Sequence, residues 1–264
     1  MRNIAVGIAL SAVLIGKSAC AADMGAPLKA PYSPPPAHSW TGCYAGGNGG
    51  AAWLNDNVTF DGNGFTPLSS PLSAAAGDGA AYGGQVGCDY QMNSNWVVGL
   101  RGMWDGTALR GTAAGEPVVP GGALLTNVNA ETKSFATAVG RVGYSVTPAL
   151  MIYGVGGGAF ADNNYSQSLT AIGVGGFGPV LLTASDAPSG WVAGAGMSWM
   201  LGPNWDIWVE YNYLGFGNRT VNTTSTNFPV PLSVTNTVQQ DVQTILVGID
   251  FRFTNWAAGQ FGLR

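Results

Sequence analysis

The stretch WDIWVEYNYLGFG, from Trp205 to Gly217, alternates between apolar and polar side chains closely enough to define its local structure. A period of two residues is that of a β-strand, because successive side chains of a strand point to opposite faces. One face holds Ile207, Val209, Tyr211 and Tyr213, and the other holds Asp206, Glu210 and Asn212, with Trp208 as its apolar exception. The fold must therefore offer a different environment on each side of this strand.

Comparable segments recur along the chain, and the predicted strands cover residues 42–53, 80–92, 95–107, 133–145, 150–161, 190–201, 205–217 and 242–253. Each is close to the ~9–11 residues of a tilted transmembrane strand plus some overhang. Short and long connections alternate. Tight turns of Asn, Pro and Gly lie near 93–95, 146–149 and 202–204, and long polar loops near 54–79, 108–132, 162–189 and 218–241. Outer-membrane barrels sort their connections in this way, whereas a soluble β-sandwich, the alternative fold, has no reason to do so.

The N-terminus indicates export. Arg2 precedes an apolar run over residues 4–16 and a small-residue cleavage site at 19–21, which is the layout of a secretory signal peptide. A lipoprotein anchor at Cys20 is disfavoured because Lys17 stands where an apolar residue is expected. The predicted organisation is a signal peptide (1–21), a Pro-rich periplasmic leader (22–39), a barrel (40–253) and a C-terminal tail (254–264).

Composition favours a membrane protein built from strands. Charged residues make up 9% of the chain, against roughly 25% in ordinary soluble domains. The 41 glycines disfavour helices, since each costs about 1 kcal/mol relative to Ala inside one. A structure that crosses lipid without helices must be a closed barrel, because open sheet edges do not survive there. The prediction is an all-β fold, an eight-stranded antiparallel up-and-down transmembrane β-barrel in the cell outer membrane, with its apolar face toward lipid.

The charged side chains of these strands share the face opposite the apolar one. A barrel of eight strands is just wide enough to be filled by its own side chains, so charges inside it need partners. We interpret them as a structural ion-pair network in the lumen; the alternative is a gate in which Glu210 and Arg101 or Arg141 control a narrow water path. The predicted lumen set is Asp89, Arg101, Asp105, Arg141, Asp206, Glu210, Asp250 and Arg252.

Aromatic residues are predicted to form two belts at the membrane interfaces, as amphipathic rings prefer. The periplasmic belt comprises Tyr44, Tyr90, Trp96, Tyr144, Trp199, Trp205 and Phe253. The outer belt comprises Trp53, Tyr82, Trp104, Phe160, Trp191 and Tyr213.

With these features the chain resembles the small porin-family or immunogenic outer-membrane proteins of Gram-negative bacteria, whose barrels are similar to the membrane domain of OmpA. The resemblance is carried by SWTGCYAGGNGGAAW, YGGQVGCDYQ, GRVGY, WVEYNYLGFG and VGIDFRF, in that order between about residues 40 and 253. It implies a structural, surface-exposed and often antigenic protein without catalytic activity. The chain departs from the pattern at Cys43 and Cys88, where an aromatic is usual, and in the eleven-residue tail after Phe253.

Nothing in the sequence predicts an enzyme, a metal site or a cofactor. The one histidine, His38, lies in the leader, so a Ser-His-carboxylate site on the barrel is excluded. A carboxylate-only site would have to come from loop residues such as Asp78, Glu116 or Asp186. The GxGxxG match at 173–178 lies in a predicted loop without a βαβ unit, so it does not indicate dinucleotide binding.

Cys43 and Cys88 are predicted on the lipid side, near the periplasmic ends of adjacent strands. Two free thiols are favoured, because buried Cys commonly serves as a small apolar residue. A cross-strand disulfide is the alternative, and it requires Cα atoms within about 7 Å.

The predicted function is structural: a monomer that presents loops to the exterior and contributes to envelope integrity. Its expected partners are outer-membrane lipid, lipopolysaccharide and the barrel assembly machinery, and no nucleic acid, since no basic stripe is present. The alternatives are a narrow channel for ions or small solutes, and adhesion through the loops.

Overall fold

The computed structural model describes residues 38–62, 70–72, 75–92, 95–119, 122–173, 179–225 and 233–253. The predicted signal peptide, the leader up to residue 37 and the tail lie outside these residues. Among the residues that are described, no helix is long and apolar enough to cross a membrane.

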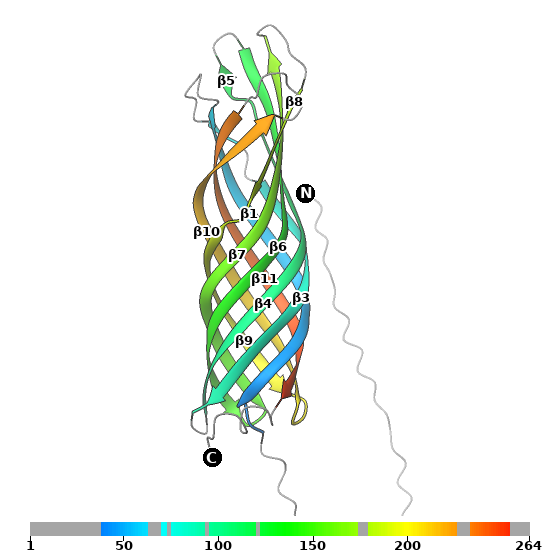
Figure 1. The fold of residues 1–264 in the computed structure, drawn as a ribbon, viewed down its shortest axis with the longest axis vertical. Helices are drawn as coiled ribbons and strands as arrows, with labels where there is room; N and C mark the ends of the chain where they lie inside the picture. Colours follow the sequence, from blue (N-terminus) through cyan, green and yellow to red (C-terminus); the bar gives the residue numbers. More distant parts are fainter. Residues whose placement is uncertain are drawn as a thin grey trace, which may run out of the picture. The chain divides into compact units, whose positions relative to one another are not determined.

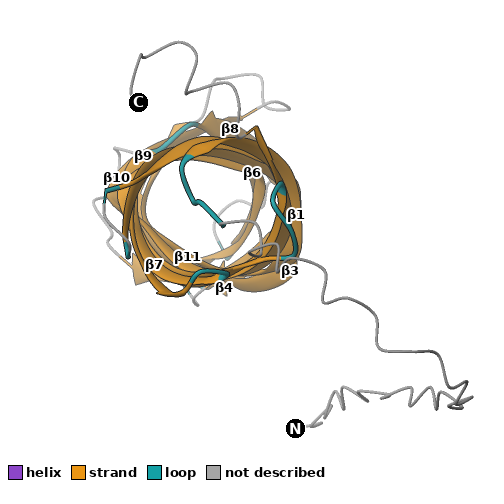
Figure 2. Cartoon of the chain, turned by 90° about the horizontal axis from the view of Figure 1, so that it is seen from below, coloured by secondary structure: helices purple, strands orange, loops and turns teal. Residues whose placement is uncertain are grey.

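The described chain is built from antiparallel strands that close into a ring of eight (Figures 1 and 2). The ring order is β1–β3–β4–β6–β7–β9–β10–β11, and β11 pairs back with β1. Short β2 pairs with β1, and β5 with β6. The strands are β1 (Gly42–Gly62), β2 (Ser70–Pro71), β3 (Ala75–Gln91), β4 (Trp96–Gly115), β5 (Val118–Val119), β6 (Gly122–Thr147), β7 (Leu150–Ile172), β8 (Val180–Asp186), β9 (Ser189–Met200), β10 (Trp205–Ser225) and β11 (Ser233–Phe253). The predicted eight-stranded barrel is confirmed.

The strands are longer than the sequence predicts. The segments 54–79, 108–132, 162–189 and 218–241 were expected to be loops, yet most of their described residues extend the strands. Their polar composition excludes them from lipid, but a sheet can continue into water when its side chains still alternate. We call the predicted transmembrane segments the membrane half of the barrel, and the extensions beyond them the outer half.

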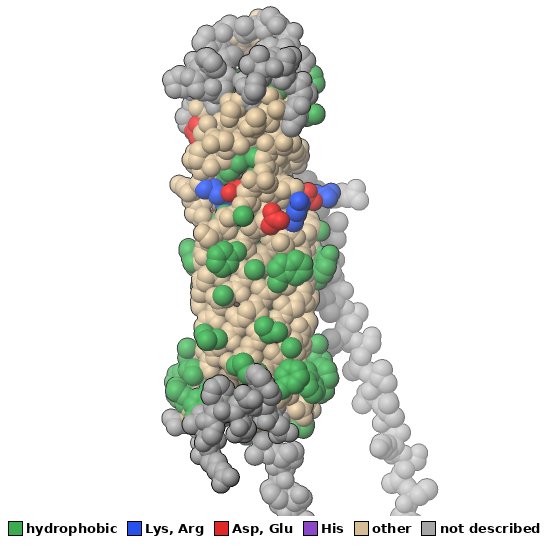
Figure 3. Space-filling model, in the orientation of Figure 1, with side chains coloured by type: hydrophobic (Ala, Val, Ile, Leu, Met, Phe, Trp, Pro, Cys, Tyr) green, Lys and Arg blue, Asp and Glu red, His purple; other side chains and the backbone are tan. Residues whose placement is uncertain are grey.

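The membrane half places apolar side chains outside, and its interior holds the charges together with a buried apolar cluster that includes Phe135 and Leu246. On β11, Val247 is 57% exposed, whereas Arg252 is fully buried. On β10, Val209 and Tyr211 point outward and Glu210 is 1% exposed. Figure 3 shows hydrophobic side chains over the surface of this half and a band of charged side chains beyond them. The predicted orientation, apolar toward lipid and charged toward the lumen, therefore holds in this half.

The outer half differs mainly on its outside. Its outward residues are mainly Asn, Thr, Ser, Gln and charged side chains. Its inward residues combine an apolar core with buried polar side chains such as Asn163, Gln167, Asn236 and Gln240. That core consists of Val58, Phe60, Leu72, Ala113, Val128, Ala130, Tyr165, Leu169, Val180, Leu182, Val221, Val234 and Val238. Water surrounds this half, so its apolar side chains gain most by facing each other.

Glycine makes room for the large lumen side chains. Trp208 on β10 is paired with Gly248 on β11 and packs where a Cβ of that glycine would stand. Asp250 lies on Gly46 in the same way. An eight-stranded barrel can therefore hold Trp and Arg side chains because a neighbouring strand gives up its own side chain at that level.

The ladder between β10 and the β8/β9 strand is interrupted in the outer half. Among the described residues no ladder pair joins 216–223 to 184–190. Pro188, which has no N–H to donate, lies in this interval. The side chains bridge the interval instead, since Arg219 Nε lies 2.5 Å from Asp186 Oδ2.

Candidate functional site: the charge network inside the barrel

All eight predicted lumen charges are buried, each at most 5% exposed. At the periplasmic end Arg252 joins two acids from other strands. Its Nε lies 2.7 Å from Asp206 Oδ1, and its Nη1 lies 3.1 Å from Asp89 Oδ2. Arg141 pairs with Asp89 from the other side, and Ser198 Oγ donates to Asp206 Oδ2 at 2.6 Å. The result is a continuous polar layer across this end of the barrel.

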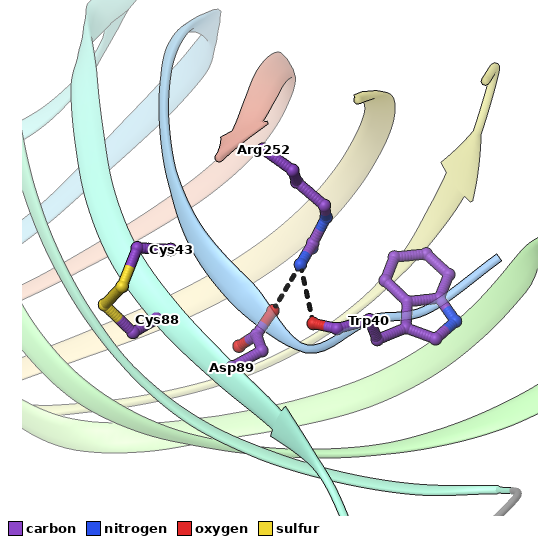
Figure 4. The surroundings of a disulfide bond; sticks show 5 residues. All are labelled: Trp40, Cys43, Cys88, Asp89 and Arg252. Carbon is purple, nitrogen blue, oxygen red and sulfur yellow. Dashed lines mark hydrogen bonds and ion pairs between the residues drawn. A yellow bond between two sulfur atoms is a disulfide. The ribbon is translucent and has the colours of Figure 1, made fainter. Parts of the chain in front are cut away.

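Aromatic rings fill the space around these guanidinium groups. Arg252 lies over the rings of Trp40 and Tyr44, at 4.9 and 5.0 Å from their centroids. Arg141 lies 5.1 Å from the ring centroid of Tyr44 and 4.9 Å from that of Tyr153. Arg252 Nη1 also donates to the Trp40 carbonyl at 2.9 Å (Figure 4). Cation–π contacts of this kind are strongest when water is excluded, so they favour a closed, dry end.

A second ion pair crosses the middle of the lumen. Arg101 donates from Nη1 and Nη2 to the two carboxylate oxygens of Glu210, at 2.8 and 2.6 Å. Asn212 Nδ2 donates to Glu210 Oε1 at 2.8 Å, and Trp208 lies 5.6 Å below the guanidinium. Both partners of the bidentate pair are almost inaccessible, at 2% and 0% of their side-chain surfaces.

The two remaining predicted acids have polar neighbours in place of a cation. Gln85 Nε2 donates to Asp250 Oδ1 at 2.6 Å, and Asn48 Nδ2 donates to Gln85 Oε1 at 2.8 Å. Asp105 is fully buried on Gly83, and among the described residues neither of its carboxylate oxygens has a hydrogen-bond partner. The side chains that meet in the lumen thus come from all eight ring strands, with β7 contributing Tyr153, and they brace the cylinder from within.

No group of three or more His, Cys, Asp or Glu in the described chain has the geometry to hold a metal ion. Every carboxylate in a lumen ion pair is engaged by a guanidinium, so none of those is free to act as a base. Asp78, Glu116 and Asp186, considered above for a carboxylate-only site, lie on three different strands or connections, and Asp186 pairs with Arg219.

Tyr44 was placed wrongly by the sequence analysis. It was assigned to the periplasmic belt, but it is 2% exposed and points into the lumen. The signal was available, because Cys43 was assigned to the lipid face and adjacent residues of a strand face opposite ways. The other predicted belt residues point outward in the structure. Trp40, also buried in the network, was not predicted as a lumen residue.

The outer half contains a buried acid that the sequence analysis missed. Asp56 is 1% exposed, and neither of its carboxylate oxygens has a hydrogen-bond partner in the described part of the chain. Burial raises its pKa to about 7, against the opposing effect of Arg219. Arg219 Nη2 is itself held by Tyr165 Oη and Gln240 Oε1, each at 2.6 Å. Residue 56 could have been found by extending the inward parity of the first strand past residue 53.

Cys43 and Cys88 form a disulfide in the structure, contrary to the favoured prediction of free thiols (Figure 4). They are paired residues of β1 and β3, and their Cα atoms are 3.9 Å apart. Both point to the outer surface, as predicted. The direct register places the two side chains together, which sequence spacing alone did not reveal. The bond ties the first ring strand to its neighbour, next to the point where β11 closes the ring.

Similarity to known proteins agrees with this geometry. The family model for an outer membrane protein beta-barrel domain matches residues 10–253. A 31 kDa outer-membrane immunogenic protein of Brucella melitensis is 30% identical over 257 residues, covering 93% of this chain and 98% of that protein. An uncharacterized protein of Coxiella burnetii is 26% identical and covers 83% and 87% of the two chains.

Solved outer-membrane proteins are similar to this chain at low sequence identity. The outer membrane protease OmpT of Escherichia coli superposes with a TM-score of 0.48 at 9% identity, covering 80% of this chain and 97% of that one. The Ail protein of Yersinia pestis superposes with a TM-score of 0.35 at 14% identity, covering 81% and 99%. Together with the ring of eight strands and its lipid-facing apolar surface, the family match shows that this chain belongs to the outer membrane β-barrel proteins and resides in the outer membrane.

Proposed function

We propose that this protein is a monomeric, non-enzymatic structural component of the outer membrane, whose filled barrel supports envelope integrity and carries a long outer half beyond the lipid. The single observation that supports it best is the bidentate Arg101–Glu210 pair, with almost no accessible surface on either side chain. Buried charges joined in this way occupy the cross-section of a narrow barrel.

The filled lumen disfavours the channel alternative. A continuous water path would have to pass both the Arg101–Glu210 pair and the layer formed by Arg252, Asp89 and Arg141. Separating these ions would leave uncompensated charges in a low-dielectric interior, which is costly. The proposed structural role needs no such separation.

Planar-bilayer recordings test the proposal directly. The purified, folded protein should show no discrete conductance steps above the lipid baseline. Glu210→Ala and Arg141→Ala address the gate alternative, because a gate built on these residues would change its open probability when either is removed. Steps in the unmodified protein that change in these variants would replace the structural proposal with a gated channel.

A cellular assay tests the envelope role. A deletion strain should become more sensitive to detergent and to large antibiotics that an intact outer membrane excludes. Complementation with the unmodified gene should restore resistance. If deletion leaves sensitivity unchanged while the barrel is abundant in the parent strain, the proposed contribution to integrity is wrong.

A further inference from the structure

The outer half carries a polar groove on its external wall, across β4, β6, β7 and β8. The groove has a volume of about 730 Å³. The outward-pointing side chains that line it all carry hydrogen-bonding groups. They include Arg110, Asn129, Glu131, Asn164, Ser166 and Thr183. Short Asn, Ser and Thr side chains with a charged pair at one end are suited to a ligand rich in hydroxyl groups.

The positive charge of the outer surface is concentrated beside this groove. Six basic residues lie in the described part of the chain, and four of them, Arg101, Arg141, Arg219 and Arg252, are engaged inside the barrel or across the interrupted ladder. The two others, Arg110 and Lys133, are exposed on neighbouring strands β4 and β6.

Both cationic side chains contact residues that line the groove. Arg110 Nη2 lies 3.0 Å from Glu131 Oε1, and 77% of the Arg110 side chain is exposed, so it can engage a further anion. With its carboxamide oxygen turned toward Lys133, Asn164 accepts a hydrogen bond from Nζ at 2.8 Å. By contrast, β11, which lies across the ring from β6, carries an outward-facing acid, Asp241.

The height of the groove identifies the layer that it faces. On the same strands, the exposed rings of Trp104 and Phe160 lie four to six residues before Arg110 and Asn164. Such rings mark the interface between hydrocarbon and headgroups. At about 3.3 Å per residue along a tilted strand, the groove begins roughly 10 Å beyond the rings. In the outer leaflet this is the level of headgroup phosphates and sugars.

We propose that this groove binds the phosphorylated saccharide headgroup of an outer-leaflet glycolipid, with Arg110 and Lys133 engaging phosphate and the Asn, Ser and Thr side chains engaging sugar hydroxyls. Arg and Lys are the usual protein partners of phosphate, Arg through parallel N–H donors and Lys as a point charge. The bound headgroup would then fix the barrel to the lipid on one wall only. This inference goes beyond the structural role proposed above, and rests only on the outer-membrane location.

Binding of purified lipopolysaccharide to the folded, delipidated barrel tests the site. The reference protein and an Arg110→Ala/Lys133→Ala variant are compared by their thermal stabilisation as lipopolysaccharide with a phosphorylated core is titrated in. The double variant should bind at least tenfold more weakly, since both phosphate contacts are lost. The matched control is Asp241→Ala on β11, across the ring from β6, which should retain the reference affinity.

Further variants and ligands distinguish specific binding at this groove from general attraction between opposite charges. Arg110→Lys/Lys133→Arg keeps both charges and should bind within a few-fold of the reference. Asn129→Ala/Ser166→Ala should weaken binding of the full headgroup but leave binding of lipid A without core sugars unchanged. The core oligosaccharide released from its lipid should bind more weakly than the intact glycolipid, which also contacts the barrel wall.

Three results would overturn the proposal. The first is equal lipopolysaccharide affinity for the Arg110→Ala/Lys133→Ala variant and the reference. The second is an equal loss in the Asp241→Ala control. The third is phosphatidylglycerol bound as tightly as lipopolysaccharide with the same dependence on Arg110 and Lys133. Heat-modifiable mobility on gels verifies that each variant is folded before it is compared.

Discussion

The two halves of this barrel expose opposite kinds of side chain on the outward face of the same strands. In the membrane half, β11 turns Ile245, Val247 and Ile249 outward and keeps Asp250 inside. In the outer half, the same strand turns Thr237 and Gln239 outward and keeps Val238 inside. Lipid accepts apolar side chains without burial by protein, whereas water does not. The surrounding solvent therefore decides whether the outward face of a strand is apolar or polar, while the inward face is mixed in both halves.

Removing one partner of the central lumen pair should have the largest effect. Glu210→Ala leaves Arg101 buried and unpaired, and should lower the free energy of unfolding by about 3–5 kcal/mol. The matched control is Glu131→Ala in the outer half, whose exposed pair with Arg110 is worth about 0–1 kcal/mol. Urea unfolding in lipid vesicles measures both. Equal small losses would mean that water fills the membrane half and screens its charges. Replacing both Arg101 and Glu210 by Leu should recover much of the loss.

The next largest difference in stability between the two halves is expected when a charge is added to the outward face. Val247→Arg places a cation against hydrocarbon and should cost about 2–4 kcal/mol if the site lies near the bilayer midplane. Gln239→Arg, on the same face of β11 in the outer half, should change stability by less than about 0.5 kcal/mol. The same urea titration compares them. A similar cost at both positions would contradict the assignment of residue 239 to water.

Asp56 should make the outer half sensitive to pH. Its pKa, about 7 in the folded protein, lies above the ordinary value of about 4 expected in the unfolded chain. The unfolded state therefore releases its proton first, and stability should fall as pH rises from about 4 to about 7, by on the order of 4 kcal/mol. Asp56→Asn should remove this dependence and be more stable than the reference at pH 8. Parallel stability–pH curves for the two proteins would show that Asp56 is not buried as an acid.

Glycine substitutions should show a smaller difference between the two faces of one sheet. Gly248→Val would force Trp208 out of its place and should cost about 1–3 kcal/mol. Gly156→Val points outward, where the nearest atom to a new Cβ is an ordinary contact at 3.9 Å, and should cost less. Unfolding midpoints of the two variants test this. Equal midpoints would mean that the lumen can accommodate added volume.

The alternation of apolar and polar side chains was enough to predict the strands and the face of the sheet on which each residue lies. Eight strands and the lumen face of residues such as Glu210 and Asp250 follow from a period of two and from the scarcity of charge. The strand ends could not be predicted, because Asn, Thr and Gly are as common in loops as on the wet face of a sheet. Segment 122–132 therefore read as loop, although β6 begins at Gly122.

The contacts between strands were less predictable than the strands. The partners of Arg252 come from β3 and β10 and depend on the ring closing with one particular register. The Cys43–Cys88 bond depends on the β1–β3 register in the same way. No local pattern encodes register across a long connection, since slippage by two residues preserves every face.

The central claim is that the outward face of the strands changes from apolar to polar between the two halves, and spin-label accessibility along β11 tests it most directly. Single cysteines from 235 to 251, in a background with Cys43 and Cys88 replaced by Ser, are probed with oxygen, which partitions into lipid, and with a water-soluble nickel reagent. Labels at 245, 247 and 249 should respond to oxygen, labels at 235, 237 and 239 to nickel, and labels at 238 and 246 to neither. Strong oxygen accessibility at 246 or 250, or at 238, would contradict the account.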